Sequence, residues 1–128
     1  MNIAREAENY IKQYFKNKER IELVKPYKGE IGFDFRNEDS EIFIEVKGSS
    51  KSKLSDVMFS MFTNAEYEKA KECIRKKLIY EVHIVLGVGT KSIKHYCIPA
   101  KTFIEKAKPD VFWYLPTTKE LEEFKLKY

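Results

Sequence analysis

Residues 31–47 of the chain have the sequence IGFDFRNEDSEIFIEVK. Two stretches with apolar residues at alternate positions, 31–36 and 41–47, flank the polar tetrapeptide at 37–40. Alternation with a period of two indicates strands, and a polar cluster of this kind favours a tight turn. We therefore predict a β-hairpin at the centre of the fold, with residues 31, 33 and 35 as the apolar set of its first strand.

The segments on either side of the hairpin predict further helices and strands around it. Apolar residues recur every three or four positions over residues 2–18, which is typical of an amphipathic helix. The other elements expected are a strand at 21–24, a flexible basic loop at 48–53, a helix at 63–77, strands at 80–88 and 92–98, and helices at 100–107 and 117–127. Helices and strands alternating in this way predict one α/β domain over residues 1–128.

The composition limits the class of protein. With 128 residues and 43% hydrophobic side chains, the chain is long enough for one folded core. The longest uninterrupted apolar run has five residues, at 111–115, so no membrane span is expected. The first residues lack an apolar signal core, which favours a cytoplasmic protein. Cys73 and Cys97 stand apart in the sequence, which argues against a disulfide scaffold and a structural zinc site.

The positive charge is concentrated in the middle of the chain. Residues 48–108 contain 12 basic and 6 acidic side chains, whereas the whole chain has a net charge of only +4. A basic segment of this kind is compatible with a face that binds a polyanion, and equally with a solvated surface rich in lysine and glutamate. The lysines expected to contact a nucleic acid are Lys51, Lys53, Lys76, Lys77 and Lys94.

The predicted hairpin brings together residues that can carry chemistry. On strand 41–47, Glu45 and Lys47 share one face, and pairing through the turn would place Asp34 beside Glu45. Two adjacent carboxylates are costly unless they share a proton or a cation, and Mg²⁺ with oxygen ligands satisfies that need. The backbone carbonyl of Val46 could supply a third oxygen. Lys47 would then orient a water molecule or stabilise charge on a phosphate.

Each of these residues also has a purely structural interpretation. Asp34 could cap the turn, and Glu45 and Lys47 could belong to a cross-strand ion-pair ladder on a solvated face. The other Glu-x-Lys match, Glu123 and Lys125 in the predicted C-terminal helix, is explained as surface charge. Thr63 and Glu66 have the spacing of a capping box, which explains both residues without catalysis. Structural roles are also favoured for His83 and His95, which have no cysteine or second histidine at ligand spacing, and for Trp113, expected in the core or in a subunit interface.

Three motifs together resemble a known superfamily. They are Glu8 on the N-terminal helix, Gly32-Phe33-Asp34-Phe35, and Ile44-Glu45-Val46-Lys47-Gly48. This arrangement is similar to that of PD-(D/E)xK, or restriction-endonuclease-like, nucleases. With Phe62-Thr63-Asn64-Ala65-Glu66-Tyr67 before a helix, it looks closest to the branch that includes the C-terminal domain of the plant protein NO VEIN and bacterial restriction-associated proteins. The similarity covers roughly residues 4–90. Phe33 precedes Asp34 where many superfamily members have proline.

The resemblance implies an αβββαβ core with a mixed sheet flanked by helices, followed here by a C-terminal strand and helix extension. It implies Mg²⁺-dependent hydrolysis of DNA phosphodiester bonds in restriction, repair or recombination, with Mn²⁺ as a substitute and junction cleavage as a narrower alternative. Asp34, Glu45, the Val46 carbonyl and Glu8 would hold the metal, and Lys47 would complete the catalytic set. A homodimer or a larger restriction-like assembly is expected. The alternative is an inactive nuclease-fold module that binds nucleic acid or a protein partner.

Overall fold

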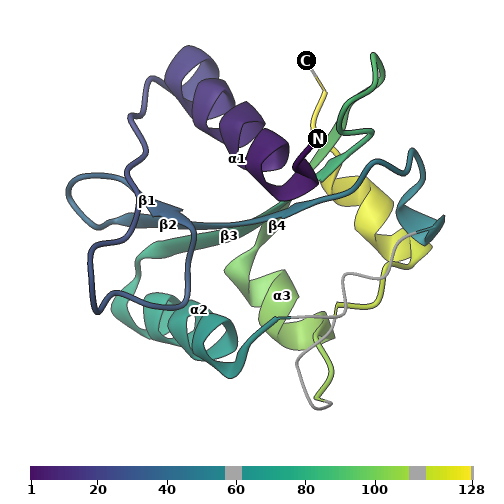
Figure 1. Cartoon of the computed structure of the whole chain (residues 1–128). Coiled ribbons are helices and arrows are strands. Elements are labelled where there is room, and N and C mark those ends of the chain that lie inside the picture. Colours follow the sequence, from purple (N-terminus) through teal and green to yellow (C-terminus); the bar gives the residue numbers. More distant parts are fainter. Residues whose placement is uncertain (57–61, 110–114, 128) are drawn as a thin grey trace.

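The computed structural model of the chain describes residues 1–56, 62–109 and 115–127. Within these residues, one mixed sheet contains β1 (Phe35–Arg36), β2 (Ile42–Gly48), β3 (Ile79–Leu86) and β4 (Lys94–Pro99), in that spatial order (Figure 1). The central strands β2 and β3 are parallel, and the two outer pairs are antiparallel. The predicted α/β class, with a mixed sheet flanked by helices, is therefore confirmed.

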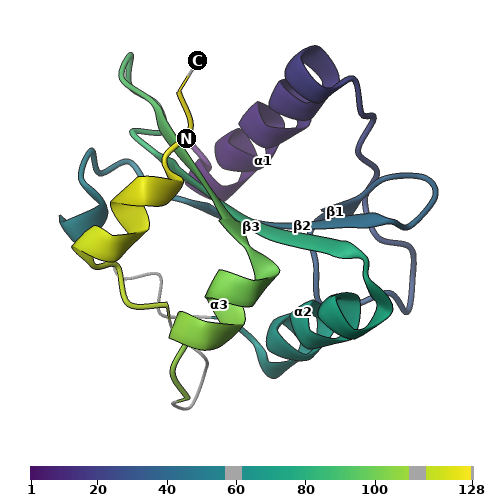
Figure 2. The ribbon, with the colours of Figure 1, turned by 180° about the vertical axis from the view of Figure 1, so that it is seen from behind.

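Helices cover both faces of this sheet. Helix α1 (Ile3–Tyr14) lies on one face, whereas α2 (Asn64–Lys76) and α3 (Ala100–Lys106) lie on the other (Figures 1 and 2). Helix α2 is the crossover between the parallel strands β2 and β3, as parallel pairing requires. Short helical turns η1 (Phe15–Glu19), η2 (Leu54–Asp56) and η3 (Lys119–Phe124) follow α1, β2 and α3 along the chain.

Strand β2 is buried on both of its faces because each face has a hydrophobic core of its own. Ile44 and Val46 pack in the core under α1, together with Ala7 and Ile11 of that helix. Phe43 packs in the larger core under α2 and α3. The alternation predicted for this strand is confirmed, and its polar face proves to lie beneath α2 instead of facing solvent.

The hairpin forms with shorter strands than predicted. The prediction of a strand at 21–24 is wrong, because only Val24 of this segment makes a β-bridge, to Arg36. The strand at 31–36 is limited to Phe35–Arg36, because Gly32 has a φ of +92°, which interrupts the extended backbone. For the same reason the predicted apolar set is wrong. Ile31 is 69% exposed, while Phe33 and Phe35 lie in the cores on opposite faces of the sheet.

The C-terminal region differs from the predicted helix over 117–127. A 3-10 helix occupies Lys119–Phe124, and Leu121 is buried against the core under α2 and α3. Residue Lys125 bridges to Tyr96 of β4, so this segment packs beside the last strand. The expectations for Trp113 and most of the run at 111–115 fall outside the described residues. Among the described helices, none is long and apolar enough to cross a membrane.

Candidate active site

Asp34 and Glu45 lie side by side, as the hairpin predicted. The backbone N–H of Asp34 donates to the carbonyl of Ile44 at 2.8 Å. Its carboxylate Oδ2 accepts a hydrogen bond of 2.8 Å from the backbone N–H of Val46. Asp34 therefore bonds to both neighbours of Glu45 on strand β2. Burial raises the pKa of Asp34, and the nearby carboxylate of Glu8 raises it further, against the opposing effect of the Val46 hydrogen bond.

Glu45 is a buried carboxyl group with an incomplete set of partners. The residue is only 3% exposed, and its Oε2 lies 3.3 Å from the ammonium of Lys47. Within the described part of the chain, no hydrogen-bond donor reaches its other oxygen, Oε1. Burial raises the pKa of Glu45 to about 9, with further contributions from the charges of Asp34 and Glu66 that outweigh the effect of Lys47.

Lys47 lies between two carboxyl groups and an aromatic ring. Besides its contact with Glu45, its Nζ is 4.0 Å from Oε1 of Glu66 and 4.6 Å from the ring centroid of Phe62. The side chain is 21% exposed, so the ammonium lies at the boundary between the protein interior and solvent. It is therefore close enough to Glu45 to act in the same site and can still reach an incoming anion.

Glu66 is a member of this cluster that the sequence did not assign to the site. The capping box is confirmed: Thr63 accepts from the backbone N–H of Glu66, and Glu66 Oε1 accepts from the N–H of Thr63 at 3.0 Å. The first turn of α2, however, lies over Lys47 and Glu45, so the capping carboxylate is also the third acidic group of the cluster. The motif at 62–67 contained this residue, but capping alone explained it.

Glu8 approaches the same cluster from α1. Its charge contributes to the raised pKa of Asp34, and its carboxylate pairs with Lys25. Glu6, on the same helix, instead lines a separate pocket with Asn9 and Tyr10. The structure therefore brings Asp34, Glu45, Lys47 and Glu8 into one electrostatically coupled group, with Glu66 in addition.

The donor set of this cluster fits a hard divalent cation. Every side-chain ligand available is a carboxylate oxygen, the donor type that Mg²⁺ and Mn²⁺ prefer. Glu45 Oε1 has no hydrogen-bond partner within the described residues, and burial raises the pKa of both Asp34 and Glu45, so a bound cation would stabilise their ionised forms. Because the N–H and C=O of one strand residue point to the same side, the carbonyl of Val46 also faces Asp34. The donor types therefore suit such a cation, and the predicted ligand set itself stays a prediction.

The five lysines expected to bind nucleic acid fall into two groups. Lys53 and Lys94 line one pocket, and Lys51 is held nearby by a hydrogen bond from the N–H of Gly87 to its carbonyl. Lys51 and Lys53 follow the C-terminal end of β2, where Lys47 also lies, and Lys94 begins β4 beside the C-terminal end of β3. Lys76 and Lys77 lie where α2 ends and β3 begins, about 20 Å away along the strands. Lys76 is paired there with Glu72 at 3.1 Å.

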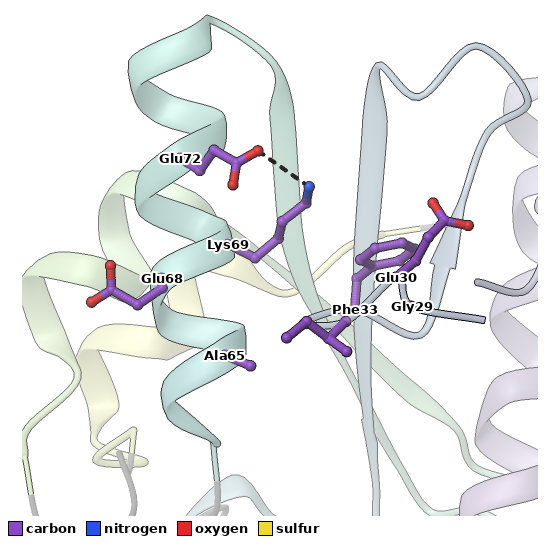
Figure 3. A pocket seen from close by; sticks show the side chains of 8 residues that line it. Gly29, Glu30, Phe33, Ala65, Glu68, Lys69 and Glu72 are labelled. Carbon is purple, nitrogen blue, oxygen red and sulfur yellow. Dashed lines mark hydrogen bonds and ion pairs between the residues drawn. The ribbon is translucent and has the colours of Figure 1, made fainter. Parts of the chain in front are cut away.

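A separate hollow lies between residues 29–33 and α2. Gly29, Glu30, Phe33, Ala65, Glu68 and Lys69 are among its lining residues, and Lys69 pairs with Glu72 at 3.4 Å (Figure 3). The hollow contains none of the predicted catalytic residues. The candidate site therefore lies beside the first turn of α2, where Glu66 approaches Lys47, and not in this hollow.

The sheet, its crossover helix and the coupled acidic residues define an α/β domain of the architecture implied by the PD-(D/E)xK resemblance. A family model described as "Protein NO VEIN, C-terminal" matches residues 7–98, and the chain belongs to this family. The matched region contains Glu8, Asp34, Glu45, Lys47 and Glu66. No curated protein and no solved structure matches the chain.

Proposed function

We propose that the chain is a metal-dependent nuclease that hydrolyses DNA phosphodiester bonds. The observation that supports this most strongly is the buried Glu45 oxygen without a hydrogen-bond partner among the described residues, next to Asp34 and Lys47. An ionised carboxylate is unfavourable when it is buried away from water, and a bound cation compensates for the lost hydration. Two acidic residues that can hold a cation and one lysine that can stabilise negative charge are together able to promote hydrolysis of a phosphodiester.

Asp34, Glu45, the Val46 carbonyl and Glu8 would hold Mg²⁺ or Mn²⁺. Such a cation, when bound, polarises a phosphoryl oxygen and lowers the pKa of a coordinated water molecule. Lys47, at 3.3 Å from Glu45, would orient the attacking water or stabilise negative charge on the phosphate. Glu66 would keep the Lys47 ammonium at the site through its own carboxylate.

The surface beside the cluster supports an anionic polymer as substrate. Lys51, Lys53 and Lys94 lie at the end of the sheet that Lys47 also approaches, so they would contact phosphates next to the cleaved bond. Such contacts weaken steeply with salt and carry little sequence information. Two copies of the chain would provide one site for each strand of a duplex, which is the role we propose for a homodimer.

The test is a cleavage assay on labelled single-stranded, duplex and four-way-junction DNA with Mg²⁺, Mn²⁺ or EDTA. Metal-dependent cutting that disappears in Lys47→Ala supports the proposal. Lys125→Ala is the matched control, because Glu123 and Lys125 repeat the Glu-x-Lys spacing on the exposed C-terminal segment. Salt-sensitive binding without cutting on any substrate would contradict the nuclease and favour a binding module.

A further inference from the structure

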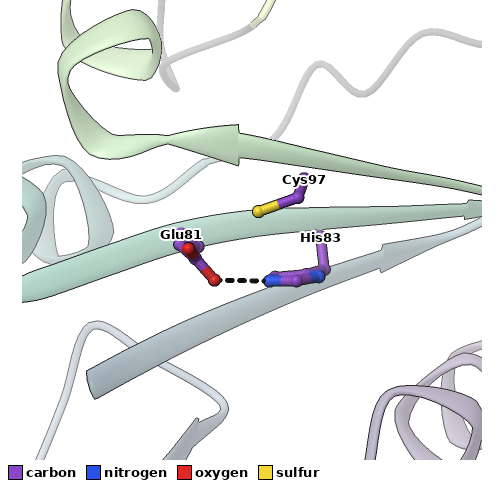
Figure 4. A group of neighbouring side chains, drawn as sticks. All are labelled: Glu81, His83 and Cys97. Atoms are coloured by element: carbon purple, nitrogen blue, oxygen red, sulfur yellow. Dashed lines mark hydrogen bonds and ion pairs between the residues drawn. The ribbon is translucent and has the colours of Figure 1, made fainter. Parts of the chain in front are cut away.

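A second group of metal-ligating side chains lies on the opposite face of the same sheet. His83 of β3 and Cys97 of β4 are directly paired across the antiparallel ladder. Glu81 precedes His83 by two positions and therefore points to the same side. One ligand atom from each of the three side chains lies within 4.8 Å of the other two (Figure 4). This face is covered by α1 and its core, whereas Glu45 faces α2.

Hydrogen bonds already connect these groups. His83 Nε2 lies 2.9 Å from Glu81 Oε1, and the Cys97 thiol donates to the Glu81 carboxylate. On its other side, His83 Nδ1 lies 2.7 Å from Nε2 of His95. Burial lowers the pKa of His95 to about 3, with a smaller contribution from His83, so its ring is neutral. With a cation on Nε2 of His83, the His95 ring would accept the hydrogen bond from Nδ1–H of His83. That bond would leave Nε2 of His83 available as a ligand.

Aromatic rings from the end of α1 hold the two imidazoles in place. Phe15 packs edge-on against His83 with ring centroids 5.2 Å apart, and Tyr14 packs against His95 at 4.7 Å. Phe15 begins the π-helical turn η1, a conformation that is rare in helices and frequent at functional sites. The ring positions are therefore fixed by packing as well as by hydrogen bonds, as a preformed metal site requires.

We propose that Glu81, His83 and Cys97 form a second metal site, specific for a borderline-soft divalent cation such as Zn²⁺. Ligand atoms on a tetrahedral zinc ion lie about 3.5 Å apart, so small side-chain rotations close the present spacing. Three protein ligands leave the fourth position for water, and the Glu81 side chain is 27% exposed. His95 is a positioning residue for His83.

The donor atoms separate this site from the one at Asp34 and Glu45. A thiol and an imidazole favour zinc over magnesium, whereas carboxylates alone favour the reverse. Burial raises the pKa of the Cys97 thiol, as does the neighbouring Glu81 carboxylate, so cation binding would displace the thiol proton. The site does not depend on the proposed nuclease function, because it shares no ligand with the α2-face cluster, which consists of Asp34, Glu45, Lys47 and Glu66.

The test is titration of the full chain with Co²⁺ as a spectroscopic substitute for Zn²⁺, followed by competition with Zn²⁺ itself. We expect one equivalent to bind with a thiolate-to-cobalt charge-transfer band, which Zn²⁺ abolishes. Cys97→Ser should remove the band, and Cys73→Ser, the matched control in α2, should keep it. Glu45→Gln should also keep the band, so this result is independent of the nuclease test.

Two further variants distinguish ligation from general packing. Glu81→Gln and His95→Gln, each checked for native circular dichroism, should weaken Zn²⁺ binding, His95→Gln by about 10–100-fold. Absence of the charge-transfer band in the wild-type chain, or its persistence in folded Cys97→Ser, would overturn the proposal. In that case Glu81, His83 and Cys97 are a hydrogen-bonded network only.

Discussion

The two faces of the sheet hold buried polar groups in opposite ways. On the α1 face, Glu81 and His83 share a hydrogen bond, and His83 bonds on to His95, so each group has a partner. On the α2 face, Glu45 has an oxygen that no donor reaches within the described residues. The first cluster is stable without a ligand, because its polar groups are hydrogen-bonded to one another. In the second cluster, burying the ionised Glu45 carboxylate is unfavourable unless a cation or a proton neutralises it.

The two proposed sites would also use different donor atoms. Strand β2 offers oxygen donors to the first, and strands β3 and β4 offer nitrogen and sulfur to the second. Because each strand alternates faces, neighbouring positions on one sheet can have different metal preferences without sharing a ligand. Variants on one face should therefore leave the other face unaffected, which is the basis of the first prediction.

Glu45→Gln should reduce the rate of Mg²⁺-dependent DNA cleavage by about 1,000-fold, because it removes the charge that would hold the cation. Cys97→Ser should leave that rate within a factor of about two, since Cys97 lies on the opposite face. Both are measured in single-turnover cleavage assays. Equal losses in the two variants would show that the two clusters act as one site.

The pH dependence of stability should also differ between the faces. Glu45 has a pKa of about 9 in the folded state against an ordinary value of 4.5, so the folded chain retains a proton that the unfolded chain releases. In EDTA, the free energy of unfolding should therefore fall as the pH rises from 6.5 to 8, by up to about 1.4 kcal/mol per pH unit. The pKa of His95 in the folded chain, about 3, lies below this pH range.

Urea unfolding at several pH values measures this slope. Glu45→Gln, which mimics the protonated acid, should lose most of it, and Mg²⁺ at pH 8 should restore stability in the wild type. A wild-type slope that Glu45→Gln leaves unchanged would assign the titration to another group.

Gly32→Ala should lower the free energy of unfolding more than Gly29→Ala does. Both glycines have a φ of +92°, so each substitution costs about 1–2 kcal/mol in backbone strain. A Cβ at Gly32 would also meet the carbonyl oxygen of Ala65 at 2.6 Å, whereas nothing lies within 4 Å at Gly29. We expect a further loss of about 2 kcal/mol at Gly32, measured by urea unfolding. Similar losses at the two positions would contradict close packing of this segment against α2.

Loss of the α2 cap should have the smallest effect. Thr63→Ala and Asn2→Ala each remove a side-chain cap, from α2 and α1 respectively, and each should cost about 1 kcal/mol. Only Thr63→Ala should also slow cleavage, by a few-fold, because Glu66 in the same turn contacts Lys47. If Asn2→Ala slows cleavage as much, the effect is one of stability and not of the site.

Local patterns predicted much of this structure. The periodicity of residues 2–18, the alternation of 41–47 and the capping box at Thr63 correspond to α1, β2 and the start of α2. Pairing of Asp34 with Glu45 followed from the short turn, because a hairpin fixes which residues face each other. These features depend on residues close together in the sequence, and the sequence therefore predicts them.

Features that depend on contacts between residues far apart in the sequence could not be predicted from local patterns. The left-handed backbone at Gly32 arises where residues 29–33 meet α2, and it exposes Ile31 and separates Phe33 from Phe35. Glu66 joins the site only because the crossover places the start of α2 over β2. His83 and Cys97 become neighbours only through the register of β3 and β4, and their sequence spacing gives no sign of it.

The most direct test of the proposed metal site at Asp34 and Glu45 is a pH titration of Glu45 itself. The titration is monitored by ¹³C NMR on protein labelled at the glutamate carboxyl carbons. Glu45→Gln assigns the resonance by its absence. Without divalent cations, the proposed site predicts a pKa of about 9, and with saturating Mg²⁺ a pKa that falls to or below the ordinary glutamate value of 4.5. An ordinary pKa without Mg²⁺, or a raised pKa that Mg²⁺ does not change, would contradict a cation site at Asp34 and Glu45.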